Sequence, residues 1–220
     1  MYYEGNRLIE EVRLNKDYKG IDTEPPVKKF KYDTNGNLIR ESYYNFEDQP
    51  IGNENKVHAK FYEYDKWNRK TKNYFVDSLY SMIEDEDVAS TLFKYDERGN
   101  LIELVRYNAQ NDISENGLGA AIERYKYDLS DELTQIVYYN KNEEVLSGGS
   151  IGAVIYKRNL SGNIIQETYL DERGYPINNS DSTAQIVREY NRNGYVISVD
   201  SLSAERAFKM TPKTYSIEFN

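Results

Sequence analysis

The chain has 220 residues, a net charge of −9, no cysteine, and 22 tyrosines against 7 phenylalanines and 1 tryptophan. The acidic charge argues against nucleic acids and anionic lipid surfaces as partners, which need a basic footprint, and the lack of cysteine excludes disulfides, thiolate zinc sites and cysteine nucleophiles. No run approaches the roughly 18 apolar residues of a membrane-spanning helix. The mean hydropathy of −0.83 predicts a thin core covered by tyrosine rings whose hydroxyls stay in water.

A tyrosine–aspartate motif recurs along the whole chain, and its clearest copy is Tyr95-Asp96-Glu97-Arg98-Gly99-Asn100-Leu101-Ile102. Its first position is held by Tyr32, Tyr64, Tyr95, Tyr127, Arg158 and Tyr190, so successive copies lie 31 or 32 residues apart. Four positions later stand Gly36, Asn68, Gly99, Asp131, Gly162 and Gly194, and Gly5 takes this place in a truncated first copy. Glycine adopts a positive φ at no steric cost, and Asn and Asp tolerate it best among the other residues. The motif therefore predicts a type I turn followed by a left-handed residue, the usual three-residue hairpin loop with a bulge.

Short runs rich in β-branched and aromatic residues flank these turns. Val57–Tyr64 and Ala184–Tyr190 precede a turn, and Leu38–Tyr44 and Ile164–Leu170 follow one. Their near-alternation is typical of strands and lacks the spacing of an amphipathic helix. Half a period later a second reversal is expected, longer and more variable, as at Asp171-Glu172-Arg173-Gly174.

In chain order, half a unit at the N-terminus leads into a polar loop from Lys16 to Val27, and complete units follow. The connector Ser78–Asp87 has room for one helical turn. The pattern dissolves after Leu202: Ala204–Met210 is predicted as a short helix or an irregular strand, and Tyr215–Phe219 as a last strand.

These elements predict an all-β fold, an elongated antiparallel meander of about six to seven hairpin units of 31 or 32 residues. Residues 1–202 would form one tandem β-hairpin repeat domain, and residues 203–220 a C-terminal closing segment.

The string Phe93-Lys94-Tyr95-Asp96-Glu97-Arg98-Gly99-Asn100-Leu101-Ile102 resembles the tyrosine–aspartate (YD, or RHS-type) repeats of bacterial surface and toxin-shell proteins. The second reversal, with Gly174-Tyr175-Pro176-Ile177-Asn178-Asn179, resembles tandem repeats of bacterial envelope proteins of unassigned role. The period here is longer than that of RHS repeats. The resemblance implies an extracytoplasmic protein, on the cell surface, in the periplasm or secreted, without catalytic machinery of its own. No leader is expected within this chain, because Met1 runs directly into repeat material.

The residues that could take part in catalysis or metal binding form no recognisable site, so we predict neither an enzyme nor a bound cofactor or metal. His58 is the single histidine and lacks the further ligands or nucleophile that a metal site or catalytic dyad needs. The aspartates that open the turns offer one carboxylate each, too few for calcium, so capping of the turn is the favoured interpretation. The Glu84–Asp87 cluster is either a solvated loop or a weak cation site. Paired carboxyls for glycoside hydrolysis cannot be placed from the sequence.

Tyrosines recur at equivalent repeat positions, and cross-strand packing accounts for them most simply. A second interpretation is that they form platforms for a protein or a polysaccharide at the cell surface. On that interpretation the candidate binding residues are Trp67, Tyr44, Tyr74, Tyr138, Tyr139 and Tyr169. The predicted function is a non-catalytic binding or assembly scaffold that presents a tyrosine-rich face; the alternatives are a purely structural spacer or shell fragment, and a glycan-active enzyme.

Overall fold

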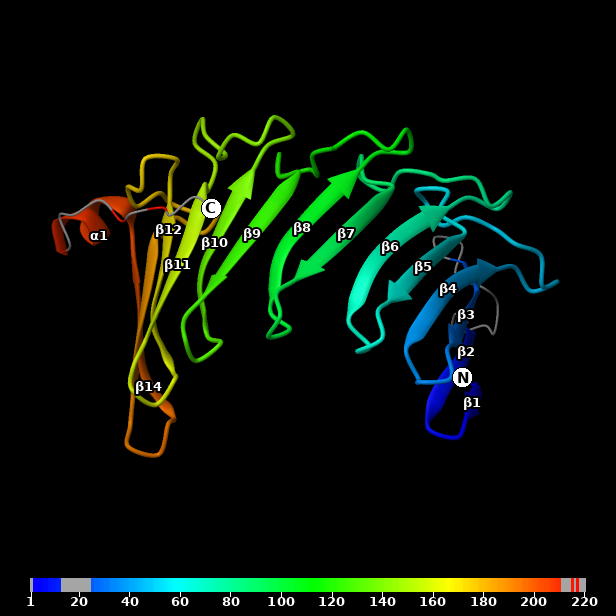
Figure 1. Ribbon diagram of the computed structural model, residues 1–220, viewed down its shortest axis with the longest axis horizontal. Coiled ribbons are helices and arrows are strands. Elements are labelled where there is room, and N and C mark those ends of the chain that lie inside the picture. Colours follow the sequence, from blue (N-terminus) through cyan, green and yellow to red (C-terminus); the bar gives the residue numbers. More distant parts are fainter. Residues whose placement is uncertain (1, 13–24, 211–214, 216, 218–220) are drawn as a thin grey trace, which may run out of the picture. The chain divides into compact units, whose positions relative to one another are not determined.

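The computed structural model describes residues 2–12, 25–210, 215 and 217. Over these residues the protein consists of 14 antiparallel strands, which follow one another in the sheet in the same order as in the sequence, and one short helix (Figure 1). The predicted all-β antiparallel meander of hairpin units is confirmed.

The strands are β1 (Tyr2–Glu4), β2 (Arg7–Val12), β3 (Val27–Tyr32), β4 (Leu38–Tyr44), β5 (Ala59–Tyr64), β6 (Lys70–Val76), β7 (Ser90–Tyr95), β8 (Leu101–Tyr107), β9 (Ile122–Tyr127), β10 (Leu133–Tyr139), β11 (Ala153–Arg158), β12 (Ile164–Leu170), β13 (Gln185–Tyr190) and β14 (Val196–Leu202). The segment predicted as a short helix or an irregular strand forms the helix α1 (Ala204–Met210). Most of the predicted last strand, Tyr215–Phe219, and of the Lys16–Val27 loop lies outside the described residues.

Contacts divide the chain into two compact units, which are described one at a time. The first comprises Met1–Phe93 and Val105–Gly117, and the second Lys94–Leu104 and Leu118–Asn220, so β7 and β8 contribute to both. The predicted boundary between residues 1–202 and 203–220 stays a prediction.

The hairpin turns have the predicted geometry. Every left-handed position has a positive φ: Gly5 60°, Gly36 93°, Asn68 63°, Gly99 95°, Asp131 62°, Gly162 82° and Gly194 81°. The residue that opens the turn caps it, as Asp65 shows: its Oδ1 accepts hydrogen bonds from the backbone N–H groups of Trp67 at 2.9 Å and Arg69 at 3.0 Å. The register shifts by one residue at Glu63/Tyr64, which is the expected bulge. The capping interpretation of the aspartates is thus confirmed.

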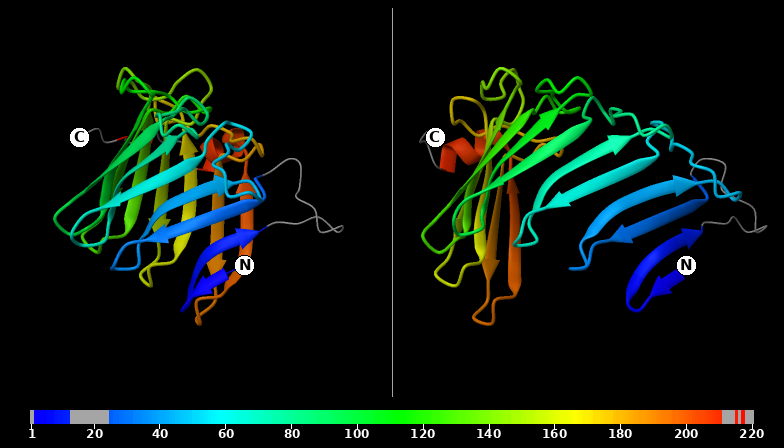
Figure 2. Two further views of the ribbon diagram at one scale, coloured as in Figure 1. Left: turned by 90° about the vertical axis from the view of Figure 1, so that its right-hand side faces the viewer. Right: turned by 45° about the vertical axis from the view of Figure 1, so that its right-hand side comes forward.

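The opposite end of each hairpin is more elaborate than predicted, because the second reversal is two tight turns in succession. After β4, Asn45 opens the first turn, which has Asp48 at φ 63°, and Asn53 opens the second, which has Lys56 at φ 63°. A single bridge between Tyr44 and Pro50 separates the two. Figure 2 shows these longer connectors at one end of the hairpins and the short turns at the other.

The helical turn expected within Ser78–Asp87 is absent, and that expectation was wrong. Asp77 opens a capped turn in which Tyr80 has a φ of 63°, and a tight turn joins Asp85 to Val88. The polar capping side chain competes successfully with helix formation, as Asp and Asn commonly do.

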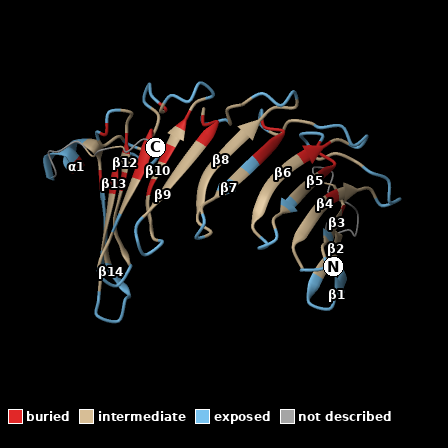
Figure 3. Cartoon of the chain, viewed as in Figure 1, coloured by how far each residue is buried: buried red, intermediate tan, exposed pale blue. Residues whose placement is uncertain are grey.

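Burial is concentrated where the strands meet the connectors (Figure 3). Many of the fully buried positions are small: Ala59, Ala89, Ala121, Ala153 and Ala184 are each 0% exposed. Alanine there lets the connectors pack down on the strand ends, which yields a core despite the low hydropathy. At the end of the second unit Ala207 of α1 packs on Ala184 and Leu202.

Candidate functional site: the seams between hairpins

Neighbouring hairpins meet along lines that we call seams, each formed by the second strand of one hairpin and the first strand of the next. Within the β3–β4 hairpin the register runs over six residue pairs, from Val27↔Tyr44 to Tyr32↔Leu38. Across the β4–β5 seam it covers only three, and the β12–β13 seam in the second unit repeats this. The hairpins are therefore joined near their connectors and separate toward their turns.

In four copies the tyrosine that opens the motif bridges this separation. Its phenol donates a hydrogen bond across the seam to a backbone carbonyl of the preceding hairpin. The bonds run from Tyr32 to Leu8 at 3.0 Å, Tyr64 to Leu38 at 2.9 Å, Tyr127 to Leu101 at 3.0 Å and Tyr190 to Ile164 at 3.0 Å. Arg158, which replaces the tyrosine in one copy, donates in the same way to the Leu133 carbonyl at 3.3 Å. Phenylalanine could not make this contact, which accounts for the preference for tyrosine at this position.

A second set of contacts joins successive turns, and it involves the two residues that replace glycine. The Asn68 side-chain oxygen accepts hydrogen bonds from the amides of Asn35 at 3.1 Å and Asn37 at 2.9 Å. In the second unit Asp131 accepts from the Asn100 amide at 2.8 Å and forms an ion pair with Arg98, also at 2.8 Å. Asn68 and Asp131 therefore do more than tolerate a left-handed backbone: they fasten one turn to the previous one.

Further tyrosines are held by carboxylates on their own strand. The Tyr43 phenol donates to Glu41 at 3.0 Å, and the Tyr169 phenol to Glu167 at 2.8 Å. Burial, followed by the hydrogen bond and charge of Glu167, raises the pKa of Tyr169 to about 12. Burial, the charge of Glu41 and Tyr64 likewise raise the pKa of Tyr62 to about 12. The Tyr169 phenol is therefore a neutral hydrogen-bond donor at physiological pH, and the Tyr62 phenol is neutral there as well.

The candidate binding residues are placed differently from one another. Trp67 is 63% exposed at its turn, but Lys66 Nζ lies 4.1 Å and Arg69 Cζ 4.7 Å from its ring centroid. Tyr139 is only 3% exposed, and its ring centroid is 4.7 Å from Arg124 Cζ. Tyr138, next to it, points to the other face of its strand because side chains alternate.

The remaining candidates are half-buried and engaged. Tyr74 stacks on Phe61, with ring centroids 5.1 Å apart. Tyr44 packs edge-on against His58 at 5.3 Å, and Tyr169 is the donor to Glu167 described above. Among the described residues the exposed tyrosines are others, at turns and terminal strands: Tyr2, Tyr3, Tyr80, Tyr175 and Tyr195. A binding role for the six candidates stays a prediction.

His58 is a packed core residue just before β5. It is 0% exposed, with Nδ1 3.2 Å from the Ile51 carbonyl oxygen and its ring edge-on to Tyr44 and Tyr80. The equivalent positions of later copies hold small residues, namely Ala89, Ala121, Gly152 and Ala184. Its burial and its contacts with Tyr44 and Tyr80 are in keeping with a structural role.

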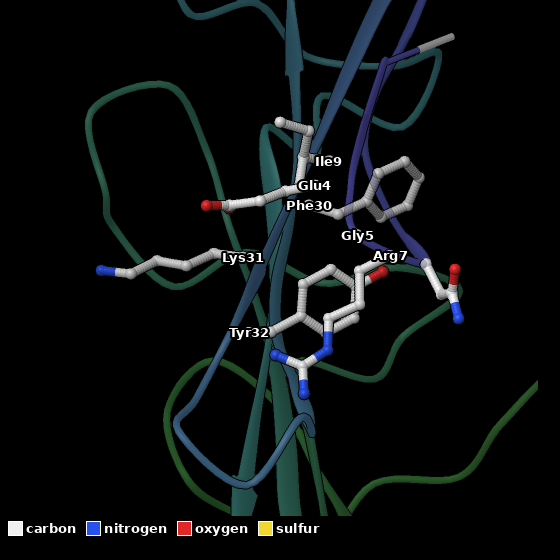
Figure 4. A pocket seen from close by; sticks show the side chains of 8 residues that line it. Glu4, Gly5, Arg7, Ile9, Phe30, Lys31 and Tyr32 are labelled. Carbon is white, nitrogen blue, oxygen red and sulfur yellow. The ribbon is translucent and has the colours of Figure 1, made fainter.

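Two open pockets lie in the seams. Figure 4 shows the one in the first unit, where the Arg7 guanidinium lies in front of the Tyr32 ring, 5.7 Å from its centroid. Its lining residues are Glu4, Gly5, Asn6, Arg7, Ile9, Phe30, Lys31 and Tyr32. The pocket in the second unit is lined by Asn159, Ile165, Gln166, Val187, Arg188, Glu189, Tyr190 and Ile197. Each lining has a single carboxylate, whereas glycoside hydrolysis uses two.

Over the part of the chain that the structure describes, no three His, Cys, Asp or Glu side chains gather as they would around a metal ion. In the same residues no helix has the length and apolar character needed to cross a membrane.

Comparison with known proteins finds no matching family model and no matching curated protein. Among solved structures, TcdB2-TccC3 without its hypervariable C-terminal region is 13% identical, with a TM-score of 0.37, and the match covers 89% of this chain and 11% of that one. TcdB2-TccC3 itself is 12% identical, with a TM-score of 0.36 and coverage of 92% and 13%. The Photorhabdus luminescens Tc holotoxin pore is 12% identical, with a TM-score of 0.30 and coverage of 84% and 11%.

The chain thus spans only 11% to 13% of the length of these toxin-complex chains. Identity and TM-score are both low, so neither fold nor function is carried over from them.

Proposed function

We propose that this chain is a non-catalytic scaffold: a structural segment of a bacterial envelope or secreted protein, in which YD/RHS-like hairpins are added one after another to extend a sheet. The observation that carries the proposal is the use of the tyrosines. Four of those that open a motif are tied to the preceding hairpin by their hydroxyl groups, and others are held by glutamates of their own strand.

The same observation favours the spacer or shell alternative over a face that presents tyrosines to a glycan. A sugar-binding platform needs exposed aromatic rings gathered on one surface, whereas the tyrosines within the strands from β3 to β13 are buried or half-buried. Trp67 is exposed, but two cationic side chains lie over its ring.

The first test is whether hairpin units are interchangeable. Deleting residues 128–158 removes one period and joins Tyr127 to Asn159, which preserves the order of the motif. For a scaffold of equivalent units we expect a folded protein with a cooperative but lower melting transition. Aggregation or loss of the β-sheet circular dichroism spectrum would contradict the proposal, because it would mean that the removed unit has a unique role.

The second test addresses the competing glycan-binding function. The immobilised protein is screened against a polysaccharide array beside a Trp67→Ala variant, which removes the exposed ring without touching the core. No saturable binding is expected from either. A saturable signal that disappears in the variant would replace the spacer role by a binding module.

A further inference from the structure

Strands β3 and β4 of the first unit bring two cationic side chains directly opposite each other, and we call these two residues the opposed pair. Lys31 pairs with Arg40 in the register of this hairpin, so both side chains point to the same face of the sheet. Figure 4 shows the Lys31 side chain extending away from the Tyr32 ring, to the side where Glu4 also points. Neither cation forms a side-chain hydrogen bond or an ion pair with any described residue, Glu4 included. Like charges opposed in this way destabilise a strand pair.

The hairpins from β5 to β14 avoid this conflict. In them the same two motif positions combine opposite charges, or one charge with a neutral side chain. The residues are Glu63 with Lys72, Lys94 with Glu103, Lys126 with Gln135, Lys157 with Gln166, and Glu189 with Ser198. The repeat itself therefore does not require two cations here, and the opposed pair is a particular feature of the β3–β4 hairpin.

The Arg40 guanidinium has a donor that the protein does not use. The side chain is half-buried, and its Nε is out of contact with solvent and has no hydrogen-bond acceptor among the described residues. Native proteins usually satisfy such a donor, because leaving it without an acceptor costs free energy. Across the β4–β5 seam Arg40 faces Phe61, whose ring stacks on that of Tyr74. These rings offer no acceptor, and they exclude water, which strengthens the attraction of a guanidinium for an anion.

The carboxylates that neighbouring elements bring to this face are matched by other lysines. Glu10 of β2 and Asp48 of the following connector both form ion pairs with Lys29, Glu10 at 3.9 Å. Glu63 of β5 stands opposite Lys72 in its own hairpin. Strand β3 itself has three lysines and no carboxylate. The charge of the opposed pair is thus not balanced within the described part of the first unit.

We propose that the opposed pair binds a dianionic oxyanion of the phosphate type, either inorganic phosphate or a phosphate monoester. The planar fork of Arg40 matches two oxygens of such a group, and Lys31 adds a compact charge from the opposite strand. A phosphate monoester carries a charge of about −1.5 to −2 near pH 7, which suits two cations, whereas a carboxylate would neutralise only one of them. This site adds a ligand to the scaffold and does not depend on how its hairpins are ordered.

The first measurement is a calorimetric titration of the full chain with inorganic phosphate, at an ionic strength held constant with sodium chloride. We expect saturable binding to a single site and a rise in melting temperature with phosphate concentration. In a parallel NMR titration the Nε–H resonance of Arg40 should shift along the same binding curve. That resonance reports on the donor that the protein leaves without an acceptor.

Lys31→Glu reverses one charge of the pair and reproduces the combination of Glu63 with Lys72 in the next hairpin, so the variant is expected to fold. It should abolish phosphate binding. Without phosphate it should melt at a higher temperature than the wild type, because attraction replaces repulsion across the strands. A role of Lys31 in stability alone would not produce these two opposite changes.

Arg40→Gln reproduces the combination of Lys126 with Gln135, which the second unit already uses. We expect it to weaken phosphate binding about 10- to 100-fold, as the loss of a charge-assisted hydrogen bond does. The matched control is Lys126→Glu, which changes the charge by the same amount at the same motif position, opposite a neutral residue. It should bind phosphate like the wild type. Circular dichroism checks that each variant is folded.

The source of the phosphate group is distinguished with O-phosphoserine and glucose 6-phosphate, which carry it on an amino acid and on a sugar. Tighter binding of the first than of inorganic phosphate would assign the site to a phosphorylated polypeptide, and tighter binding of the second to a phosphorylated glycan. Equal binding of all three would assign it to the ion itself.

Three results would overturn the proposal. One is the absence of saturable phosphate binding to the wild type. Another is unchanged binding in folded Lys31→Glu and Arg40→Gln. The third is an equal loss of binding in Lys126→Glu, which would reduce the effect to the overall charge of the protein. The deletion of residues 128–158 that tests the scaffold function lies in the other unit, so failure here is distinguishable from failure of that function.

Discussion

The two ends of a hairpin differ in what holds them. The turn end carries the recurring motif, is largely exposed, and depends on a left-handed residue, a capping side chain and a tyrosine hydroxyl that crosses the seam. At the connector end the recurring residues are small residues and an Asn or Asp that caps the first connector turn. This end nevertheless contains most of the buried side chains, including Leu170 and Thr168 at 0% exposure. The recurring motif of this chain therefore marks the backbone conformation of the turns, whereas we expect stability to come mainly from the buried side chains at the connector end.

The largest effect should come from the connector end. Leu170→Ala removes a fully buried side chain, and we expect a loss of about 2–5 kcal/mol in the free energy of unfolding, measured by chemical denaturation. Leu160→Ala is the matched control, because Leu160 lies fully exposed in a turn of the same unit. Similar losses in the free energy of unfolding of both variants would contradict the assignment of the core to the connector end.

At the turn end, Gly99→Val should cost about 1–3 kcal/mol, because a β-branched side chain is strained at a φ of 95°. Thermal and denaturant melts measure it. Gly117→Val tests the same substitution where a Cβ would meet open space and where φ is not left-handed. A Gly99→Val protein that melts like the wild type would contradict the importance of the turn conformation.

The seam itself should contribute less per contact. Tyr127→Phe removes only the hydroxyl that donates to the Leu101 carbonyl, and we expect a loss of about 0.5–1.5 kcal/mol. Tyr195→Phe changes a phenol that is 70% exposed and should leave stability unchanged. If the two variants unfold at the same denaturant concentration, the tyrosine hydrogen bond across the seam does not contribute to stability.

A stabilising substitution sharpens the comparison from the other side. Lys56 occupies a left-handed position at the connector end, where glycine is better suited, so Lys56→Gly should raise the free energy of unfolding by roughly 0.5–1 kcal/mol. Glu54→Gly, in the same turn, gains no such relief and should destabilise slightly. If Glu54→Gly rather than Lys56→Gly raised the free energy of unfolding, the backbone strain would not lie at Lys56.

The pH dependence should separate the two kinds of contact. Burial and Glu167 raise the pKa of Tyr169 to about 12, so its contribution is complete below pH 10, the usual value, and is lost as pH rises toward about 12. In the turns, the Asn37 side chain, helped by backbone N–H groups, lowers the pKa of Asp33 below 3.8, so that contribution is present above this pH and is lost below it. Stability curves of Tyr169→Phe and Asp33→Asn should therefore flatten at opposite ends of the pH range. A change at the same end in both would contradict these assignments.

The sequence alone determined the repeat, the hairpin turns and the strands. These depend on local chemistry: only Gly, Asn and Asp suit the left-handed position, and alternation marks the strands. The residues from Leu38 to Tyr44 and from Ile164 to Leu170 form strands over the predicted ranges. The hydrogen bond of the motif tyrosine across the seam also has a trace in the sequence: where Arg158 replaces the tyrosine, the side chain is still a hydrogen-bond donor.

Only the tertiary structure decided where the connectors fold and what the tyrosines contact. The left-handed positions at Lys56, Tyr80 and Glu143 carry residues with no strong preference for that conformation, so these residues gave no sign of the double turn. Packing over the small residues at the strand ends imposes it. Likewise, the seam register joins residues about 26 positions apart, and which face or edge stays exposed depends on the neighbouring hairpin.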